Sequence, residues 1–421
     1  MRRVARPVLH VAPETGWIND PNGPVEWRGR FHLFFQRNPV AAEWAPRVHW
    51  GHAVSDDLCS WELWPDALVP ADAGPDSGGC WSGCVVDDGG VPTAVYSGLG
   101  ERGEAAESVC VARGDTALRT WRKDPANPVL AGPPDPRMTA FRDPFVWRED
   151  GGWRMVIGAG MPEGDGAVLA YRSRDLLSWQ PDGVLVRGLE GTICECPQYF
   201  TLGGRRVLLA SVAEDAPSHV LALVGDEVEG RFLAERTERF DHGPVAYAPA
   251  TMLDSSGRRL AWLWAREASD AVAGAVAGAL TFPRVLTLGE DGALRIAPAP
   301  ELRRLRGEPA VDGDRLEVVA ALRPSGGLRI GGAAIRWDGA ELRVGGSRAA
   351  VGSRAGETLR LHAFLDGDLL ELYADERLAF TERVGPGGGV HAEGARPAEL
   401  RSWRLAAPRG RCAGVPRWCG C

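Results

Sequence analysis

The sequence predicts an all-β protein, a five-bladed β-propeller followed by a C-terminal β-sandwich. A strand–turn–strand pattern recurs five times in the first 300 residues or so. After about residue 310, short alternating runs separated by glycine-rich turns fill the chain. Repeats of this length that consist of short strands are typical of propeller blades.

Each of the five repeats joins a turn signal to an apolar or alternating run, which is the pattern of a β-hairpin. The repeats are residues 27–36, 87–98, 149–160, 202–212 and 254–265. Two further segments, SDDLCSW (55–61) and SRDLLSW (173–179), share Ser, Asp, Leu, Ser and Trp at equal spacing.

Five polar motifs keep nearly the same period as the hairpins. WIND begins at residue 17, WSG at 81, FRDP at 141, ECP at 195 and YAPA at 247. Equivalent strands of five blades surround one axis, so acids that are far apart in sequence should converge at one end of it. The alternative is an irregular series of hairpins in a sandwich, and the agreement of the two periods disfavours it.

The pattern of predicted strands and turns changes near residue 300. Residues 296–309 predict a linker with a short helical piece, and runs such as RLEVVAAL and TLRLHAFL predict a β-sandwich. We therefore expect a propeller domain over 1–300, a sandwich domain over 301–408 and a mobile, cysteine-containing tail over 409–421. The three tail cysteines lack a fourth ligand, which makes a zinc site a weak hypothesis.

Charge and composition exclude several classes of partner and cofactor. The net charge is −8 and no basic block occurs, so neither nucleic acid nor an anionic membrane is an expected partner. No convincing secretory signal or membrane-length apolar run is present, which predicts a cytoplasmic enzyme with mostly free thiols among its nine Cys. No glycine-rich phosphate loop joins a strand to a helix, so we expect no nucleotide, redox cofactor or metal. The oligomeric state is not predicted.

Three acidic residues stand out: Asp20 in WINDPNGP, Asp143 in FRDP and Glu195 in CECP. Cleavage of a glycosidic bond usually needs two carboxyl groups, one neutral and one charged. Taken singly, an Asp before Pro is often only a turn former, and Glu195 could be an ordinary strand-end carboxylate. The Cys and Pro residues around Glu195 give it an apolar environment. A charged group is costly there, which favours a functional role for Glu195.

The motifs together carry a family resemblance. WINDPNGP, FHLFFQ, WGHAVSDDLCSW, WSG, FRDP, ECP and AGALTFPRVL occur in that order, followed by DGDLLELYADERLAFTERV. The ordered set resembles glycoside hydrolase family 32, the family of invertases, inulinases and levanases, over about residues 9–405. The resemblance implies a five-bladed propeller followed by a sandwich. It also implies hydrolysis of β-linked terminal fructosyl units of sucrose or short fructans, with retention through a covalent intermediate.

The resemblance also implies roles for individual residues. Asp20 would attack the anomeric C2, Glu195 would act as general acid and then as general base, and Asp143 would bind fructose hydroxyls and stabilise the transition state. The expected substrate-binding residues are Asn19, Gln36, Trp44, Trp81, Ser82 and Arg142. Either Trp could instead be a packing residue, and Arg142 could instead hold Asp143 or Glu195 in place.

Departures from the family pattern leave the substrate range open. They are Cys84, Ile193, Gln198, Val245 and Ala246, which we expect near the leaving sugar or the outer fructose units. A fructosyltransferase with the same acids is the first alternative. A non-catalytic fructan-binding protein and a hydrolase for another furanoside are the others; retention of all three acids argues against the binding protein, and WINDPNG and ECP favour fructose.

Overall fold

A computed structural model of the protein describes residues 6–101, 107–213, 218–267, 276–351, 358–385 and 387–406. Within these ranges the regular elements are β-strands, apart from one 3-10 helix at Pro300–Leu305. The prediction of an all-β protein is therefore confirmed. None of the helical residues in these ranges forms a helix long and apolar enough to cross a membrane.

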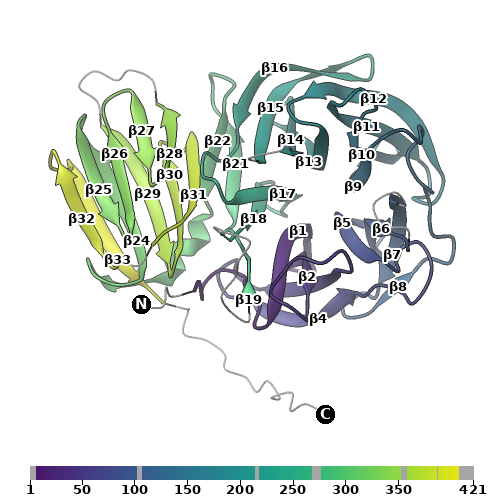
Figure 1. The fold of residues 1–421 in the computed structure, drawn as a ribbon, viewed down its shortest axis with the longest axis horizontal. Coiled ribbons are helices and arrows are strands. Elements are labelled where there is room, and N and C mark those ends of the chain that lie inside the picture. Colours follow the sequence, from purple (N-terminus) through teal and green to yellow (C-terminus); the bar gives the residue numbers. More distant parts are fainter. Residues whose placement is uncertain are drawn as a thin grey trace, which may run out of the picture.

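Five sheets are built from residues 16–298, and Figure 1 shows them arranged around a common centre. The first sheet contains β1 (Gly16–Trp27), β2 (Arg30–Asn38), β3 (His49–Ser55), β4 (Glu62–Leu68) and β19 (Val276–Ala277). The second contains β5 (Gly79–Asp87), β6 (Pro92–Leu99), β7 (Glu107–Gly114) and β8 (Trp121–Lys123). The third contains β9 (Ala140–Glu149), β10 (Gly152–Gly160), β11 (Gly166–Ser173) and β12 (Trp179–Leu189).

The other two sheets of this group follow the same antiparallel order. The fourth contains β13 (Ile193–Leu202), β14 (Arg205–Ala213), β15 (His219–Val228) and β16 (Arg231–Arg239). The fifth contains β17 (Ala246–Leu253), β18 (Arg259–Ala265), β20 (Ala279–Leu280), β21 (Arg284–Leu288) and β22 (Leu294–Pro298). The short strand β19, which follows β18 in the chain, pairs in parallel with β1 and so joins the region of the fifth sheet to the first.

Each predicted hairpin joins the first two strands of one of these sheets. Two-residue turns with positive φ at both positions connect three of the pairs, at Arg28–Gly29, Asp150–Gly151 and Gly203–Gly204. Such turns match the natural twist of antiparallel strands, which is why Gly is favoured in them. The five-fold hairpin pattern read from the sequence is therefore confirmed.

The repeated Ser-x-Asp segments also fold alike. Ser55 Oγ accepts hydrogen bonds from the backbone N–H groups of the second and third residues after it, and Ser173 Oγ does the same. Leu58 and Leu176 then adopt positive φ values of 63° and 65°. The sequence repeat thus encodes a repeated turn.

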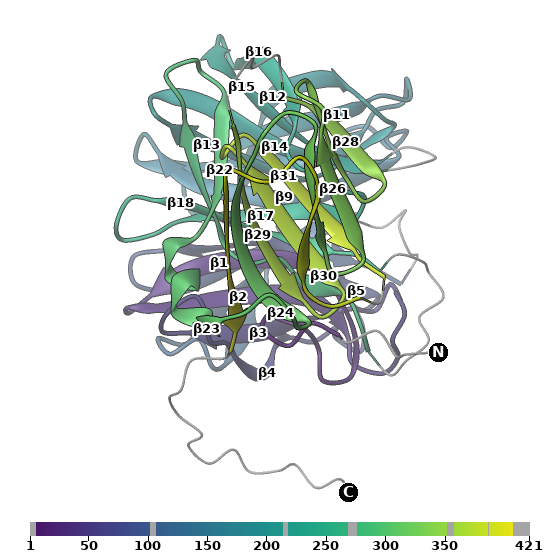
Figure 2. The ribbon, with the colours of Figure 1, turned by 90° about the vertical axis from the view of Figure 1, so that its left-hand side faces the viewer.

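Two more sheets are built from residues 306–405. One contains β23 (Arg306–Pro309), β24 (Arg315–Leu322), β29 (Leu359–Asp366), β30 (Leu369–Ala374), β31 (Leu378–Arg383) and β33 (Glu399–Leu405). The other contains β25 (Gly326–Ile330), β26 (Ala333–Trp337), β27 (Glu341–Val344), β28 (Ser347–Ala350) and β32 (Val390–Gly394). Their inward-facing apolar residues form one shared core. Figure 2 looks from this side and shows both sheets in front of the other five.

A second apolar cluster joins the two groups of sheets. Phe282 and Leu305 pack in it with Phe364 of β29 and Tyr373 of β30. The expected helical piece between the groups is the 3-10 helix, flanked by β22 and β23 rather than by an irregular linker. The predicted tail over 409–421 lies outside the described residues.

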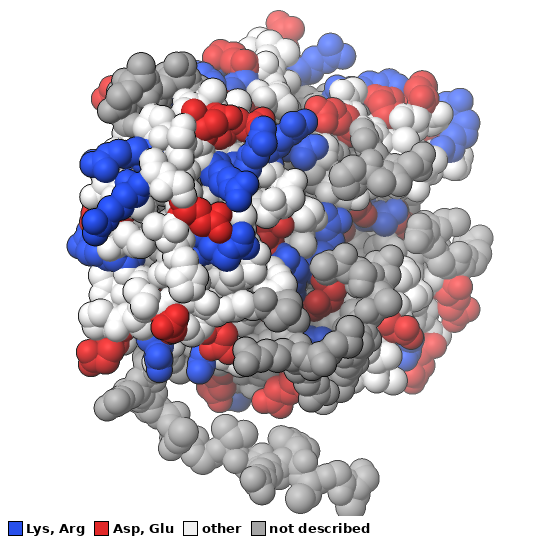
Figure 3. Space-filling view, turned by 60° about the vertical axis from the view of Figure 1, so that its left-hand side comes forward, with Lys and Arg blue, Asp and Glu red and all other residues white. Residues whose placement is uncertain are grey.

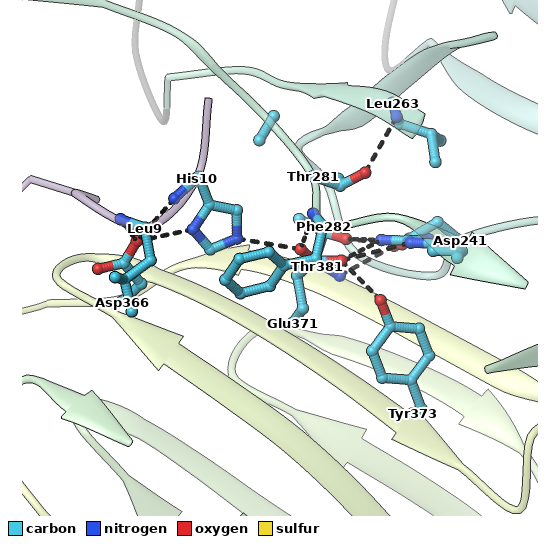
Figure 4. A network of polar contacts seen from close by, with 12 residues as sticks. Leu9, His10, Asp241, Leu263, Thr281, Phe282, Asp366, Glu371, Tyr373 and Thr381 are labelled. Carbon is cyan, nitrogen blue, oxygen red and sulfur yellow. Dashed lines mark hydrogen bonds and ion pairs between the residues drawn. The ribbon is translucent and has the colours of Figure 1, made fainter. Parts of the chain in front are cut away.

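A buried polar network reinforces this junction (Figure 4). The guanidinium of Arg284 in β21 bonds to Asp241 at 2.8 Å and to Glu371 of β30 at 2.9 Å. Thr381 of β31 donates its backbone N–H and its hydroxyl to Asp241. Removing one partner of such a buried pair leaves an uncompensated charge, so the network strongly disfavours separation of the two groups of sheets.

His10 ties the N-terminal segment into the same network. Its Nδ1 lies 2.8 Å from Asp366 Oδ2, its Nε2 lies 3.1 Å from Glu371 Oε1, and its ring stacks on Phe282 at 3.8 Å. Both ring nitrogens therefore face carboxylate oxygens, and only the imidazolium can donate to both. Burial alone would lower the pKa of His10, but the hydrogen bonds and charges of Asp366 and Glu371 outweigh it and raise that pKa.

This geometry predicts a pH-dependent contribution to stability. Because folding raises the pKa of His10, the stabilisation that its charged form contributes is complete at pH values below its ordinary pKa of about 6.5. This stabilisation is lost as pH rises through the raised pKa of the folded protein. As pH rises above about 6.5, the Tm of the wild type should fall by more than the Tm of His10→Gln does. Thermal unfolding over this range measures the difference. His391→Gln, at an exposed histidine, should follow the wild type; equal slopes for His10→Gln and the wild type would contradict the assignment.

Candidate functional site

The first strands of the five N-terminal sheets carry the polar motifs, and each strand is irregular at its motif. The register shifts after Ile18 in β1, after Cys80 in β5, after Glu195 in β13 and after Tyr247 in β17. In β9 the shift leaves Asp143 and Pro144 without register partners. Bulges of this kind bend a strand and change the direction of its side chains.

Proline explains much of this irregularity. Pro21, Pro144, Pro197 and Pro249 lie inside β1, β9, β13 and β17, where a missing N–H is tolerated only at bulges and edges. The residues before three of them have positive φ, at 67° for Asp143, 46° for Cys196 and 50° for Ala248. This conformation is costly for residues other than Gly and is concentrated at functional sites. The first strands also contact one another in the sequence β1, β5, β9, β13, β17 and back to β1.

Asp20 on β1 lies at the meeting point of several donors. Ser82 Oγ donates to its Oδ2 at 2.7 Å, and Asn19 Nδ2 donates to its Oδ1 at 3.2 Å. The thiol of Cys196 lies 3.6 Å from the same Oδ2. These donors fix the orientation of the carboxylate while its side chain remains only partly buried.

Glu195 on β13 is held from two sides. Tyr247 OH donates to its Oε2 at 2.6 Å, and Arg142 Nη1 lies 3.4 Å from its Oε1. The Glu195 side chain is 22% exposed. The carboxyl group is therefore oriented by neighbours from β9 and β17 and still open to solvent.

Asp143 on β9 is the most buried of the three acids, with 5% of its surface exposed. Its Oδ2 accepts the backbone N–H of Cys196 at 2.9 Å and lies 3.5 Å from the thiol of that residue. Its own backbone N–H donates to Ser97 Oγ at 2.7 Å, which holds the strained backbone in place. The Cys196 thiol thus lies between Asp143 and Asp20.

The three carboxyl groups influence one another electrostatically. Burial raises the pKa of Asp20 to about 6, with a further increase from the charge of Glu195; the hydrogen bonds from Ser82 and Asn19 oppose it. Burial and the charges of Glu195 and Asp20 raise the pKa of Asp143 to about 8, against the attraction of Arg142. A pKa of about 8 keeps Asp143 mostly protonated at neutral pH, where Asp20 is mostly ionised. A site with both charged and protonated carboxyls can perform acid and nucleophile chemistry together.

The structure also brings together the predicted neutral residues. Asn19 donates to Gln36 Oε1 at 2.6 Å, and Gln36 Nε2 donates to Ser82 Oγ at 2.7 Å. With the bonds that Ser82 and Asn19 donate to Asp20, these contacts form a closed ring of four hydrogen bonds that includes the carboxylate. All three neutral side chains are buried, and they place amide and hydroxyl groups beside Asp20.

The two predicted tryptophans differ in exposure. Trp81 is 6% exposed, donates through Nε1 to Pro46 O, and lies under the guanidinium of Arg142 at 5.1 Å. Trp44 is 48% exposed and meets Trp81 edge to face at 6.3 Å. Trp81 is thus largely a packing residue at the edge of the site, whereas Trp44 presents a free aromatic face beside it.

Arg142 contacts the site through Glu195 rather than through Asp143. Its Nε also pairs with the buried Glu107 at 2.9 Å. The guanidinium of Arg142 therefore holds Glu195 in place, which is one of the alternatives that the sequence left open for it.

Some residues of the site were missed in the sequence. Tyr247 belongs to the YAPA motif, whose period marked the fifth sheet, yet its contact with Glu195 depends on which face of β17 meets β13. Ser97 and Glu107 lie outside the five polar motifs, and they support Asp143 and Arg142 from the second sheet. Cys196 was noted only as an apolar neighbour of Glu195.

Two residues that differ from the family pattern were expected near the substrate, but their side chains lie away from the three acids. Cys84 is buried, and its sulfur accepts the backbone N–H of Val146 at 3.2 Å. Gln198 is buried, and its Oε1 accepts the backbone N–H of Thr251 at 2.8 Å. Both side chains therefore join neighbouring sheets instead of facing a sugar, because the bulges turn the residues beyond them away from the acids.

No group of three or more His, Cys, Asp or Glu side chains in the described part of the chain is arranged to hold a metal ion. The three acids are held by hydrogen-bond donors and by one arginine instead.

Comparisons with known proteins identify relatives of this arrangement. A family model described as the N-terminal domain of glycosyl hydrolases family 32 matches residues 10–298. A raffinose invertase of Escherichia coli is 37% identical over 321 residues, which cover 71% of this chain and 66% of the invertase. A fructan 6-exohydrolase of Triticum aestivum is 36% identical over 352 residues, covering 73% of this chain and 58% of that protein. The chain thus spans less than two thirds of the length of these relatives.

A solved structure extends the similarity to nearly the whole chain. The GH32 beta-fructofuranosidase of Bombyx mori superposes with a TM-score of 0.84 at 26% identity, covering 97% of this chain and 95% of that one. A variant of the same enzyme has been solved in complex with sucrose.

Proposed function

The chain belongs to family 32 of the glycosyl hydrolases, and on that basis we propose that it is a retaining β-fructofuranosidase acting on sucrose or short fructans. The observation that carries the proposal is the meeting of Asp20, Asp143 and Glu195 in one site, on three different sheets, with the Cys196 thiol between the two aspartates. Two carboxyl groups flanking one bond are the usual requirement for glycoside cleavage.

We further propose that the five N-terminal sheets are the blades of one closed propeller, and that the last two sheets form a separate sandwich domain beginning near residue 301. The ring of contacts among the first strands supports closure, as does the pairing of β19 with β1. This arrangement explains how acids from residues 20, 143 and 195 reach one end of an axis.

Asp20 is the proposed nucleophile. One carboxylate oxygen attacks C2 of the fructosyl unit as the bond from C2 to the leaving oxygen breaks, giving a covalent fructosyl ester. The donors from Ser82 and Asn19 orient the carboxylate for this attack. A pKa of about 6 leaves Asp20 mostly ionised at neutral pH.

Glu195 is the proposed acid and base. It transfers its proton to the leaving oxygen in the first step, and it accepts a proton from water as that water attacks C2 of the ester in the second. Tyr247 and Arg142 hold the two carboxyl oxygens from opposite sides, which orients the group in both protonation states.

Asp143 is proposed to bind fructose hydroxyls more strongly as the ring flattens. Asp143→Asn keeps the shape of the side chain but can neither ionise nor donate a carboxyl proton, so kcat should fall by more than KM rises, because interactions made mainly in the transition state have that signature. Steady-state kinetics with sucrose measure both constants. A change confined to KM would make Asp143 a simple binding residue, and no change in either would reduce it to a turn former before Pro144.

Trp44 and the ring of amides around Asp20 are the proposed sugar contacts. The exposed Trp44 face suits the apolar side of a sugar ring. Asn19 and Gln36 each offer a donor and an acceptor, and Asn19 Oδ1 has no partner among the described residues, so it can accept a bond from a sugar hydroxyl while the existing ring is kept.

A sugar-release panel tests the proposed function. The purified chain is incubated with sucrose, sucrose 6-phosphate, raffinose, inulin and levan, and released fructose is measured against time. We expect fructose release from at least sucrose or a short fructan. Transfer products at high sucrose would favour the fructosyltransferase alternative, and absence of release from all five sugars would overturn the proposal.

A further inference from the structure

A second pocket lies behind the acid cluster, further along the same first strands. Its volume is about 430 Å³. Its lining includes Gly23, Cys84, Phe145, Gln198 and Thr251, one from each first strand and two to four residues beyond Asp20, Ser82, Asp143, Glu195 and Tyr247. At about 3.3 Å per residue, the pocket is about 7–13 Å along the strands from those residues. It is therefore distinct from the proposed sugar site.

Most charged groups that line this pocket already have partners. Arg206 pairs with Glu149 at 2.6 Å, and Arg148 lies 3.4 Å from Asp88. Glu26 accepts the backbone N–H and the hydroxyl of Ser255 at 2.7 and 2.8 Å. The two arginines are therefore neutralised by carboxylates, whereas Glu26 is hydrogen-bonded but keeps its negative charge.

Arg259, at the start of β18, is the exception. No carboxylate of the described residues lies within ion-pair distance of its guanidinium, which rests over the Phe200 ring at 4.4 Å. Its Nε is buried and has no acceptor among the described residues. The nearest acid along the chain, Asp254, is bonded to Arg258 instead.

The environment of Arg259 disfavours an unaccompanied charge. Burial lowers the pKa of Arg259 to about 10, and no nearby carboxylate opposes this effect. Trp147, which lines the same pocket, has a buried indole N–H that also lacks an acceptor. Two donor-only groups without acceptors on one pocket favour a ligand that supplies oxygen acceptors and negative charge.

We propose that this pocket binds a small oxyanion, a phosphate or a carboxylate, through the Arg259 guanidinium. The pocket volume suits a compact ligand rather than a polymer. Thr251 and Gln198 lie on the same lining, but both are engaged in the bond between their strands, so Arg259 supplies the charge that selects the ligand. Anion binding here is independent of the proposed sugar hydrolysis.

Calorimetric titration tests the proposal directly. Inorganic phosphate and acetate are titrated separately into the full chain at constant ionic strength in chloride, which distinguishes a tetrahedral oxyanion from a carboxylate. We expect saturable one-site binding of at least one of them. Arg259→Met should weaken it at least about tenfold, because a charge-assisted hydrogen bond is lost. Arg148→Met, at an arginine of the same pocket that has its own partner, should bind like the wild type.

Thermal unfolding separates this role from a structural one. Methionine loses the contact of the guanidinium with Phe200, but it keeps an apolar side chain there and removes a largely buried charge that no carboxylate compensates. Arg259→Met in chloride should therefore melt no lower than the wild type. The bound anion should raise the Tm of the wild type only. Absence of binding to the wild type, equal binding by Arg259→Met, or a lower Tm for Arg259→Met without any anion effect would overturn the proposal. If Arg259→Met does not fold, Arg259→Lys replaces it; weakened binding supports the proposal and unchanged binding overturns it.

Discussion

Asp20→Asn should lower kcat for sucrose by about three decades or more while leaving the protein folded. Removal of a nucleophile eliminates the covalent step itself, and losses of this size are typical for groups that act in bond breaking. Asparagine keeps the shape of Asp20 and can still accept the bond from Ser82. Turnover of sucrose by purified enzyme gives the measurement. Near wild-type turnover in a folded Asp20→Asn variant would remove Asp20 from the mechanism.

The same substitution should not reduce stability. A carboxyl whose folded pKa is raised costs folding free energy once it is ionised, and this cost is present at pH values above about 6. Asp20→Asn should therefore melt at or above the wild-type Tm at pH 7. Asp72→Asn, at an exposed carboxyl, is the matched control and should change neither activity nor Tm. A large drop in the Tm of Asp20→Asn would mean that its activity loss reflects unfolding.

Glu195→Gln should lower kcat for sucrose by about two to four decades, because proton transfer to the leaving oxygen is lost. The loss should be smaller for an aryl fructoside, whose leaving group needs little protonation. Added azide should then accelerate turnover of that substrate, since an anionic nucleophile needs no general base to attack the fructosyl ester. Initial rates with both substrates, with and without azide, measure these differences.

The control for this substitution is Glu14→Gln, at an exposed glutamate outside the site. It should behave like the wild type with either substrate. Equal losses for sucrose and the aryl fructoside in Glu195→Gln would place Glu195 outside the proton transfer and leave it a positioning role.

The fold was predictable because its signals are local and repeated. Each hairpin carries its own turn residues and alternating run, and the Ser-x-Asp segments at 55 and 173 fold through the same local hydrogen bonds. The three acids could be singled out because each lies within two residues of a Pro, in a polar motif that keeps the period of the five hairpins. Both signals, the hairpin pattern and the polar motif, are contained in segments of a few residues.

The missed features depend on contacts that no short segment encodes. Gln198 was expected near substrate, yet the bulge after Glu195 changes which face its side chain occupies, and one residue of register reverses every side chain beyond it. Tyr247 was visible as a motif residue, but its partner is set by the packing of β17 against β13. The pairing of His10 with Asp366 and Glu371 joins opposite ends of the chain, and no local pattern predicts it.

We propose that a terminal fructosyl unit is released through a covalent intermediate on Asp20, and the configuration of the first product tests this most directly. NMR of the fructose released from sucrose, recorded before mutarotation, should show the β-anomer first. That result corresponds to two displacements at C2 and net retention. Initial release of the α-anomer would mean a single displacement by water, with Asp20 acting as a base, and would contradict the mechanism.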